Sequence, residues 1–310
     1  MNMKKSFIGQ VVAISVYAFA LSFLWNTLNP LILPYIIARL EPEFKNTLLG
    51  LITAVGLVVA IVVQPLAGGI SDRSRFRWGK RRPFILVGTL ADLVFLAMMA
   101  LTGSYWVLFL AYCLLQTSSN VAHGPYQGFI PDLMPEEKRG LASGAKNLVE
   151  LLALIIGSAI IGLLLGQNQP LLAFIVIGLV LAATVLITML YVREQPASGA
   201  PSSVAVPRLS LSAVGMAVQR HSVFAWYVLS RFMILAGLGS VRTFAQNYIQ
   251  DVLLADNPAA LAGRLMTILG VAVLVVVLPA GHLADAIGRK RLNLIAVAIG
   301  FVGTILMMRA

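Results

Sequence analysis

The chain has 310 residues, of which 59% are hydrophobic and only 11% carry a charge. Its mean hydropathy of +0.89 is far above that of a soluble globular domain, which excludes an ordinary water-soluble enzyme or binding module. The formal net charge is +11. Its cations are spread over the whole chain instead of one cluster, so nucleic-acid binding is disfavoured. We therefore expect an all-α integral membrane protein whose surroundings are a lipid bilayer.

Enzyme and metal chemistry are not visible in the sequence. The single cysteine, Cys113, lies in an apolar run and cannot form an internal disulfide. The three histidines, His123, His221 and His282, lack the spacing of metal ligands. A phosphate-binding loop and a serine nucleophile motif are also missing. We expect no catalytic residue, no metal and no cofactor.

Nine apolar runs are long enough to cross a bilayer as helices. We place these runs near residues 8–38, 47–71, 83–102, 105–130, 141–166, 170–192, 223–250, 260–284 and 292–308. The first run is longer than one crossing requires, and Asn29-Pro30 and Pro34 inside it predict a kinked or broken helix. Residues 1–5 resemble the start of a signal peptide, but no small-residue cleavage site follows, so we assign them to the first helix.

The distribution of the cations favours one orientation in the membrane. About 17 of the 23 Lys and Arg residues fall in loops on the same side as Lys4 and Lys5. The other cations are Arg39, Lys45, Arg264 and Arg309 on the opposite side, and Arg231 and Arg242 within a predicted span. Because cytoplasmic loops carry an excess of Lys and Arg, we expect a multi-pass protein of the cell (inner) membrane with a cytoplasmic N-terminus.

A change of composition divides the chain in two. Residues 195–203 read Gln-Pro-Ala-Ser-Gly-Ala-Pro-Ser-Ser, which is typical of a linker. We expect a six-helix bundle at 1–192, a cytoplasmic linker at 193–222 and a partial second bundle of three helices at 223–310.

One short pattern occurs twice, each time between two predicted spans. The residues of the first copy are Gly68, Asp72, Arg73, Gly79, Arg81 and Arg82, and those of the second are Gly281, Asp285, Gly288 and Arg289. Glycine lets two helices approach closely, and the aspartate can face a helix N-terminus or an arginine. The cations hold the loop in the cytoplasm. Both copies therefore predict a polar latch at one membrane surface, which acts as a gating loop.

At these residues the chain resembles the major facilitator superfamily, whose signature loop joins helices 2 and 3 and again helices 8 and 9. The second copy is the closer match. The first has an insertion, Ser74-Arg75-Phe76-Arg77, and continues into Arg81-Arg82-Pro83-Phe84-Ile85. This longer loop is similar to that of the sucrose transporter branch and the related glycoside cation symporters.

A second stretch carries the same resemblance. The turn at residues 125–140 is similar to the corresponding cytoplasmic turn of bacterial sugar-type facilitators. It holds Asp132 and Arg139, which we consider as partners of the first gating loop. A solvated charged loop is the alternative.

The resemblance implies a fold and a function class. The fold is a helical bundle with a six-helix N-terminal half and three helices of the C-terminal half. Since the second half of the superfamily mirrors the first, we expect the chain to be truncated after helix 9, where the run 292–308 barely crosses once. The implied function is alternating access, with symport of a small polar solute, such as a sugar, and a coupling cation, proton or sodium.

Charged residues inside the predicted spans are candidates for ion coupling and substrate binding. Glu150 lies about 14 Å along the fifth helix, close to the bilayer midplane, where a carboxylate can carry a proton. An ion pair with Lys146, one turn earlier, is an equally good interpretation. Asp92 lies at similar depth, but the resemblance places its helix in an outer layer, which favours a structural hydrogen bond. Arg231 lies on the seventh helix, which lines the cavity of the superfamily, and snorkelling is its alternative.

Amides and one aromatic gather on the first, fourth and seventh helices, as recognition of a hydroxyl-rich solute requires. The candidate binding residues are Trp25, Asn26, Asn29, Gln116, Asn120, His123, Gln246 and Asn247. On the fourth helix a spacing of three or four residues places them on one face. The alternative is that these amides form hydrogen bonds between helices of a polar membrane core.

Two other functions stay open. One is an efflux antiporter of the same superfamily, although the chain lacks the Gly-Pro pair in helix 5 and the arginine with Gln-Gly in helix 4 that such antiporters carry. The other is a truncated gene product or sensor that transports nothing. The oligomeric state is not predicted.

Overall fold

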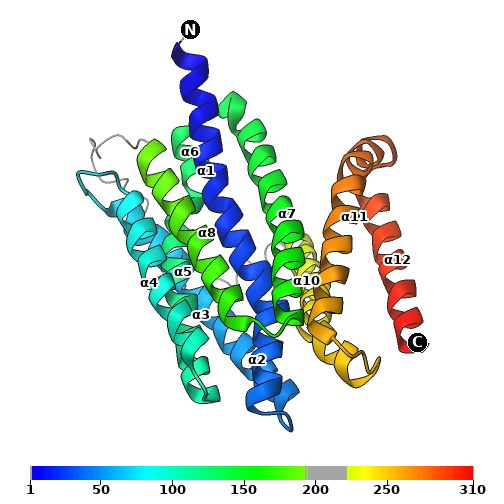
Figure 1. Cartoon of the computed structure of the whole chain (residues 1–310). Helices are drawn as coiled ribbons and strands as arrows, with labels where there is room; N and C mark the ends of the chain where they lie inside the picture. Colours follow the sequence, from blue (N-terminus) through cyan, green and yellow to red (C-terminus); the bar gives the residue numbers. More distant parts are fainter. Residues whose placement is uncertain (1, 193, 195–221, 310) are drawn as a thin grey trace.

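The structure is a computed structural model, which describes residues 2–192, 194 and 222–309 (Figure 1). In this part of the chain every regular element is a helix, as the composition predicts. The predicted linker at 193–222 lies outside the described residues, apart from Glu194 and Ser222. The division into two bundles and a linker therefore stays a prediction.

The first apolar run forms three consecutive segments, as its prolines predict. These are α1 (Asn2–Thr27), the π-helical turn η1 (Leu28–Ile32) and α2 (Leu33–Leu40). Pro30 lies inside η1 and Pro34 lies in the first turn of α2. Because proline has no backbone N–H, the α-helical hydrogen bonds cannot continue unbroken through this region. The predicted break in the first helix is confirmed.

The other helices follow the predicted runs, with ends shifted by a few residues. They are α3 (Lys45–Arg73), α4 (Arg82–Leu101), α5 (Tyr105–Gln127), the short α6 (Phe129–Leu133), α7 (Glu136–Gly166), α8 (Pro170–Tyr191), α10 (Ser222–Asp251), α11 (Pro258–Ile287) and α12 (Arg289–Arg309). The largest shift is at α7, which begins before residue 141 because Glu136 and Glu137 favour the first turn of a helix.

All nine predicted runs form helices, and seven helices of the described part are long and apolar enough, by length and composition, to cross a membrane. The helix α5 does not qualify because residues 116–120 are five consecutive polar residues, which lower its hydropathy. Its neighbours α3 and α4 pack against it, and four of these five residues are buried, Thr117 being exposed. The helix α12 also does not qualify, and its last side chains lie outside the described residues.

The helices pack as a bundle with loops at two ends (Figure 1). The helix α1 packs against α7 and α8, and α5 lies between α3 and α4. The second part of the chain joins the first where α11 packs on α7 and where α10 contacts η1 and α2. Beside α11, α12 lies at the edge of the bundle (Figure 1).

The two ends of the bundle carry different loops. We call the end that holds residues 74–81 and 128–135 the N-terminal end, because α1 begins there. The distal end is the opposite one, and it holds residues 41–44, 167–169 and 252–257. The position of a side chain along the bundle is described relative to these two ends.

Candidate functional site

A chain of hydrogen bonds links α1 to α5 inside the bundle. Asn120 Nδ2 donates to Gln116 Oε1 at 3.2 Å, and Gln116 Nε2 donates to the hydroxyl of Tyr112 at 2.9 Å. The Tyr112 hydroxyl donates to Asn29 Oδ1 at 3.0 Å. Trp25 meets the ring of Tyr112 edge-on, with the ring centroids 6.3 Å apart. The structure therefore brings four of the predicted binding residues together.

Tyr112 links Gln116 to Asn29 in this series of hydrogen bonds, although the sequence did not predict it as a binding residue. An aromatic residue in an apolar run is ordinarily a core residue, and Tyr112 is indeed only 1% exposed. The signal that was available is its spacing, because Tyr112, Gln116 and Asn120 follow each other at four-residue intervals and so share one helix face.

Removing the Tyr112 hydroxyl should weaken the contact between α1 and α5. We expect Tyr112→Phe to cost about 1–3 kcal/mol, because Asn29 Oδ1 and Gln116 Nε2 lose a buried partner. The thermal unfolding midpoint of the detergent-purified chain would fall. The control is Tyr227→Phe, which removes a hydroxyl from a side chain on α10 that is 61% exposed. Equal midpoints for the two variants would contradict the prediction.

A second group of hydrogen bonds joins α1 to α7 and α10. Asn26 Nδ2 donates to the Ser22 carbonyl and hydroxyl oxygens, each at 2.8 Å. The Ser22 hydroxyl donates to the Glu150 carbonyl at 2.8 Å. Arg242 Nη2 donates to Asn26 Oδ1 at 2.7 Å. The predicted binding residue Asn26 thus lies where the first part of the chain meets α10.

The two carboxylates proposed for ion coupling occupy different surroundings. Glu150 Oε1 lies 2.8 Å from Lys146 Nζ, which is the ion pair that the sequence left open. Asp92 is fully buried and accepts a hydrogen bond from the Ser118 hydroxyl of α5. Its Oδ2 has no hydrogen-bond partner in the described part of the chain. This contact is the structural hydrogen bond that the sequence favours for Asp92, and a coupling role for either residue stays a prediction.

Two predicted binding residues lie away from these hydrogen bonds. Arg231 is exposed on α10, about three helical turns before Arg242, so α10 places Arg242 and not Arg231 at Asn26. His123 lies near the C-terminus of α5, toward the N-terminal end of the bundle, with its Nε2 3.4 Å from Gln127 Nε2.

At the distal end α10 closes onto the first part of the chain. Asn247 Nδ2 donates to Asn46 Oδ1 at 2.5 Å, and Lys45 Nζ lies 2.5 Å from Asp251 Oδ1. Asn247 therefore contacts the first turn of α3 and not the hydrogen bonds of α5.

Gln246 bridges two backbone groups at the break in the first helix. In the amide orientation that fits its neighbours, it donates to the Leu31 carbonyl at 3.0 Å and accepts from the Tyr35 N–H at 3.2 Å. These groups lie where η1 passes into α2. The irregular backbone that Pro30 and Pro34 cause is thus bound by a side chain of α10.

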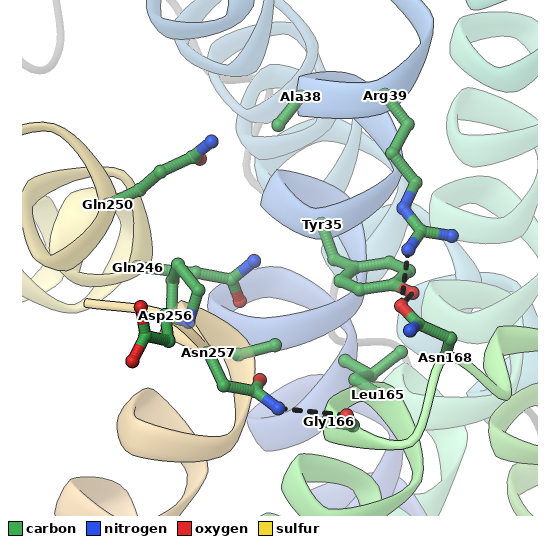
Figure 2. A pocket seen from close by; sticks show the side chains of 12 residues that line it. Tyr35, Ala38, Arg39, Leu165, Gly166, Asn168, Gln246, Gln250, Asp256 and Asn257 are labelled. Atoms are coloured by element: carbon green, nitrogen blue, oxygen red, sulfur yellow. Dashed lines mark hydrogen bonds between the residues drawn. The ribbon is translucent and has the colours of Figure 1, made fainter. Parts of the chain in front are cut away.

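A cavity of about 250 Å³ lies beside these distal contacts (Figure 2). On one side the Arg39 guanidinium stacks on the Tyr35 ring, 4.2 Å from its centroid, and donates to Asn168 Oδ1 at 2.6 Å. Below it, Asn257 Nδ2 of the second part donates to the Gly166 carbonyl at 2.8 Å. Both parts of the chain therefore line the cavity, and their contacts hold the distal end closed.

At the N-terminal end, Arg81 occupies the centre of an ionic network. Its Nη2 lies 2.9 Å from Asp72 Oδ1, its Nε lies 2.8 Å from Asp132 Oδ2, and its Nη1 donates to the Pro125 carbonyl at 3.0 Å. Lys80 Nζ also lies 2.8 Å from Asp132 Oδ2. The first gating loop thus binds Asp132 of the turn between α5 and α7.

Glu194 completes this network from the far end of α8. Its Oε2 accepts from the backbone N–H groups of Arg81 at 3.0 Å and Arg82 at 3.1 Å, at the N-terminus of α4. A carboxylate is favourable there because the first N–H groups of a helix have no partner within the helix. Arg82 in turn donates to the Met189 carbonyl of α8. The sequence analysis missed Glu194 because it begins a segment read as linker.

The other residues of the gating loops have local roles in the structure. Gly68 lies against Gly124, where an added Cβ on Gly124 would come within 3.0 Å of the Gly68 nitrogen, so glycine allows α3 and α5 to approach closely. Arg73 ends α3 and is exposed. Arg139 donates to the Pro131 carbonyl at 2.8 Å and so stays within its own turn, away from the first gating loop.

The second copy of the pattern lies where α11 passes into α12. Gly281 lies in α11, and Gly288 lies between the two helices with a φ of +89°. Gly79 in the first copy has a φ of +107°, so both loops use glycine where other residues would be strained. The side chains of Asp285 and Arg289 lie outside the described residues.

The Asp132 contacts predict a pH dependence of stability. Burial acts to raise the pKa of the Asp132 carboxyl, but hydrogen bonds and charges from Arg81 and Lys80 outweigh it and hold the pKa below its ordinary value of 3.8. A carboxyl whose pKa is lower in the folded chain than in the unfolded chain stabilises the fold at pH values above its unfolded pKa. This contribution disappears as the pH falls through the folded pKa. We expect Asp132→Asn to lower the unfolding midpoint at neutral pH. The difference from the wild type should shrink below pH 3.8. A difference that stays constant at all pH values would contradict this assignment.

Comparison with known proteins agrees with this geometry. The family model of the Major Facilitator Superfamily matches residues 14–310. The multidrug resistance protein MdtG of Enterobacter lignolyticus (strain SCF1) is 24% identical over 260 residues, which cover 81% of this chain and 58% of MdtG. The sucrose transport protein SUT1 of Oryza sativa subsp. japonica is 26% identical over 160 residues, 44% of this chain and 29% of SUT1. The chain therefore spans less than two thirds of these relatives.

Two solved structures share the fold. The nucleoside transporter NupG has a TM-score of 0.63 and 14% sequence identity, over 93% of this chain and 69% of NupG. A D-xylose–proton symporter has a TM-score of 0.62 and 16% identity, over 89% of this chain and 69% of the symporter. With the family model covering nearly the whole sequence, the chain belongs to the Major Facilitator Superfamily, a family of membrane transporters and not of enzymes.

Proposed function

We propose that the chain forms the greater part of a secondary active transporter that moves a small polar solute by alternating access. The observation that carries this proposal is the meeting of Asn26 and Arg242 inside the bundle, because each comes from a different part of the chain. A polar contact between two parts that can separate is what an alternating solute site requires.

The described arrangement supports one step of such a cycle. The distal end is closed by contacts of α10 with η1, α2 and α3, whereas residues 226–241 of α10 are exposed. We propose that the path opens at the N-terminal end. With the positive-inside rule, this end faces the cytoplasm in the proposed orientation.

We propose a hydroxyl-rich solute, such as a sugar, and import by symport. Amides at Asn29, Gln116 and Asn120 offer donors and acceptors, and Trp25 offers an aromatic edge. Similarity to a sucrose transport protein and to the fold of a D-xylose–proton symporter supports this choice. Similarity to MdtG favours the second candidate, which is efflux of a drug.

Glu150 is the proposed carrier of the coupling proton. When protonated, its side chain would release Lys146, and its backbone carbonyl holds Ser22, which in turn binds Asn26. A change at Glu150 would therefore reach the place where α1 meets α10. Asp92, buried between α4 and α5, is the second candidate.

Transport by reconstituted protein tests the proposal. Proteoliposomes with an imposed proton gradient would be offered radiolabelled sucrose, lactose, xylose and glucuronate. We expect gradient-driven accumulation by the wild type. Glu150→Gln should lose this accumulation and keep exchange of solute, because the neutral amide mimics the protonated acid. The control Glu43→Gln alters an exposed carboxylate of the distal loop and should behave as wild type. Absence of both accumulation and exchange with the whole panel would refute the proposal.

A further inference from the structure

Arg242 is a cation inside the bundle whose buried donor is not used. It lies in the candidate span Ala225–Asp251, nine residues before the distal end, which is about 13 Å along a helix. Its Nη2 donates to Asn26 Oδ1 at 2.7 Å. Its Nε is buried and has no hydrogen-bond partner among the described residues. An amide oxygen is neutral, so this contact leaves the positive charge uncompensated.

The other charges inside the described spans do not neutralise Arg242. Glu150 pairs with Lys146 on its own helix, at 2.8 Å. Asp92 binds Ser118 between α4 and α5. Arg231, the second cation of α10, is exposed. Arg264, in the span of α11, is exposed as well. None of these groups supplies a carboxylate to Arg242, which lies beside the proposed solute site.

A cation without a carboxylate partner at this depth is costly, and such a cation usually faces a cavity or a partner of opposite charge. Guanidinium presents its N–H donors in a planar fork that fits a carboxylate through two parallel hydrogen bonds. The Nε of Arg242, which has no hydrogen-bond partner among the described residues, is one of the two donors of such a fork. Asn26 at the end of α1 and Asn29 in η1 are three residues apart and add amide groups for hydroxyls.

We propose that Arg242 determines specificity at this site and that the solute carries a carboxylate, as an acidic sugar does. The inference rests on the proposed function and narrows its substrate class. In the empty site Arg242 holds Asn26, and in the loaded site its Nε and Nη2 donors hold the solute carboxylate. Recognition is then strongest when α10 and α1 are close together, so solute binding couples to closure of the distal end.

Binding of matched probes to the purified chain in lipid nanodiscs tests this assignment. The probes are methyl β-D-glucoside, methyl β-D-glucuronide and glucose 6-phosphate, which share a sugar ring and differ in charge. Titration calorimetry would give the affinity of each for the wild type, for Arg242→Gln and Arg242→Lys, and for a control. The control is Arg264→Gln, because Arg264 is an exposed arginine of α11 without a predicted role in binding. We expect the wild type to bind the glucuronide about 10- to 100-fold more tightly than the glucoside, the factor that a charge-assisted hydrogen bond supplies.

The variants should separate recognition from a structural role. Arg242→Gln should abolish the preference for the glucuronide, Arg242→Lys should keep part of it, and Arg264→Gln should keep all of it. A purely structural contact between α10 and Asn26 would change stability without changing this ratio. If Arg242→Gln fails to fold, the inference is tested by the ratio of the glucuronide and glucoside affinities in the wild type and in Arg242→Lys.

Three results would overturn the inference. They are equal affinity of the wild type for glucoside and glucuronide, a preference that survives in Arg242→Gln, and tighter binding of the phosphate than of the carboxylate. Uptake of neutral sucrose or xylose that Arg242→Gln leaves unchanged would refute the inference while the proposed function stands. Absence of binding and uptake for every probe would refute both.

Discussion

Arg81→Gln is expected to destabilise the folded chain by about 2–4 kcal/mol, because it removes the centre of the ionic network at the N-terminal end. Arg81 is only 6% exposed and contacts Asp72, Asp132 and the Pro125 carbonyl together. Its loss leaves those oxygens without their main donor. The expected cost is below that of a fully buried pair, because the Asp72 side chain is 47% exposed and Asp132 retains Lys80.

The matched control for Arg81 is Arg77, an exposed arginine in the same loop. Arg77→Gln removes the same charge and should leave the unfolding midpoint of the detergent-purified chain nearly unchanged. Arg81→Lys should fall between the two, since an ammonium group cannot reach both carboxylates in the fork geometry of a guanidinium. Equal midpoints for Arg81→Gln and Arg77→Gln would show that the network does not hold the loop.

The helices were predictable because the bilayer restricts what a chain can do. A spanning segment must satisfy its own backbone hydrogen bonds, so apolar runs of about 20 residues become helices. Pro30 and Pro34 predicted the break in the first helix, because proline lacks the backbone N–H that a helical hydrogen bond requires. Hydropathy alone fails at α5, which packs between α3 and α4 and buries four of the five polar residues 116–120. That helix is recognisable by its polar face instead.

The candidate site was predictable only within each helix. Periodicity placed Gln116 and Asn120 on one face, and the structure joins them by a hydrogen bond. Which residues of different helices meet depends on tilt and packing, which periodicity does not contain. Arg231 and Arg242 both lie in the same span, yet only Arg242 reaches Asn26. Glu194 accepts hydrogen bonds from backbone N–H groups at the start of α4, and no side-chain pattern in the sequence predicts such a contact.

The two parts of the chain meet where α7 packs against α11, at a contact that we call the seam. Small residues of both helices form it. A Cβ on Gly162 would lie 2.7 Å from the Cα of Gly263, and one on Gly263 would lie 2.8 Å from the Ser158 carbonyl oxygen. Further along, a Cβ on Gly166 would lie 2.8 Å from the Cβ of Ala260. The two helices therefore touch backbone to backbone, as small residues at membrane helix contacts permit.

Gly162→Leu is accordingly expected to push α11 away from α7 and to cost about 3 kcal/mol. This is the upper end for overpacking, because a backbone atom cannot move aside as a side chain does. The control is Gly144→Leu, on the same helix, where a Cβ would meet no atom within 4 Å. Since both variants gain the same helix propensity, their difference reports the contact alone.

Two measurements decide whether Gly162 holds the seam. Thermal unfolding should show a lower midpoint for Gly162→Leu than for Gly144→Leu. Spin labels at Ile160 of α7 and Leu269 of α11, which are 39% and 45% exposed, should move apart in Gly162→Leu and keep their separation in Gly144→Leu. Cys113 would be replaced by serine for this labelling. An unchanged label distance with an unchanged midpoint would mean that the two parts of the chain are held together by the distal polar contacts, Lys45 with Asp251 and Asn46 with Asn247, and not by the glycine seam.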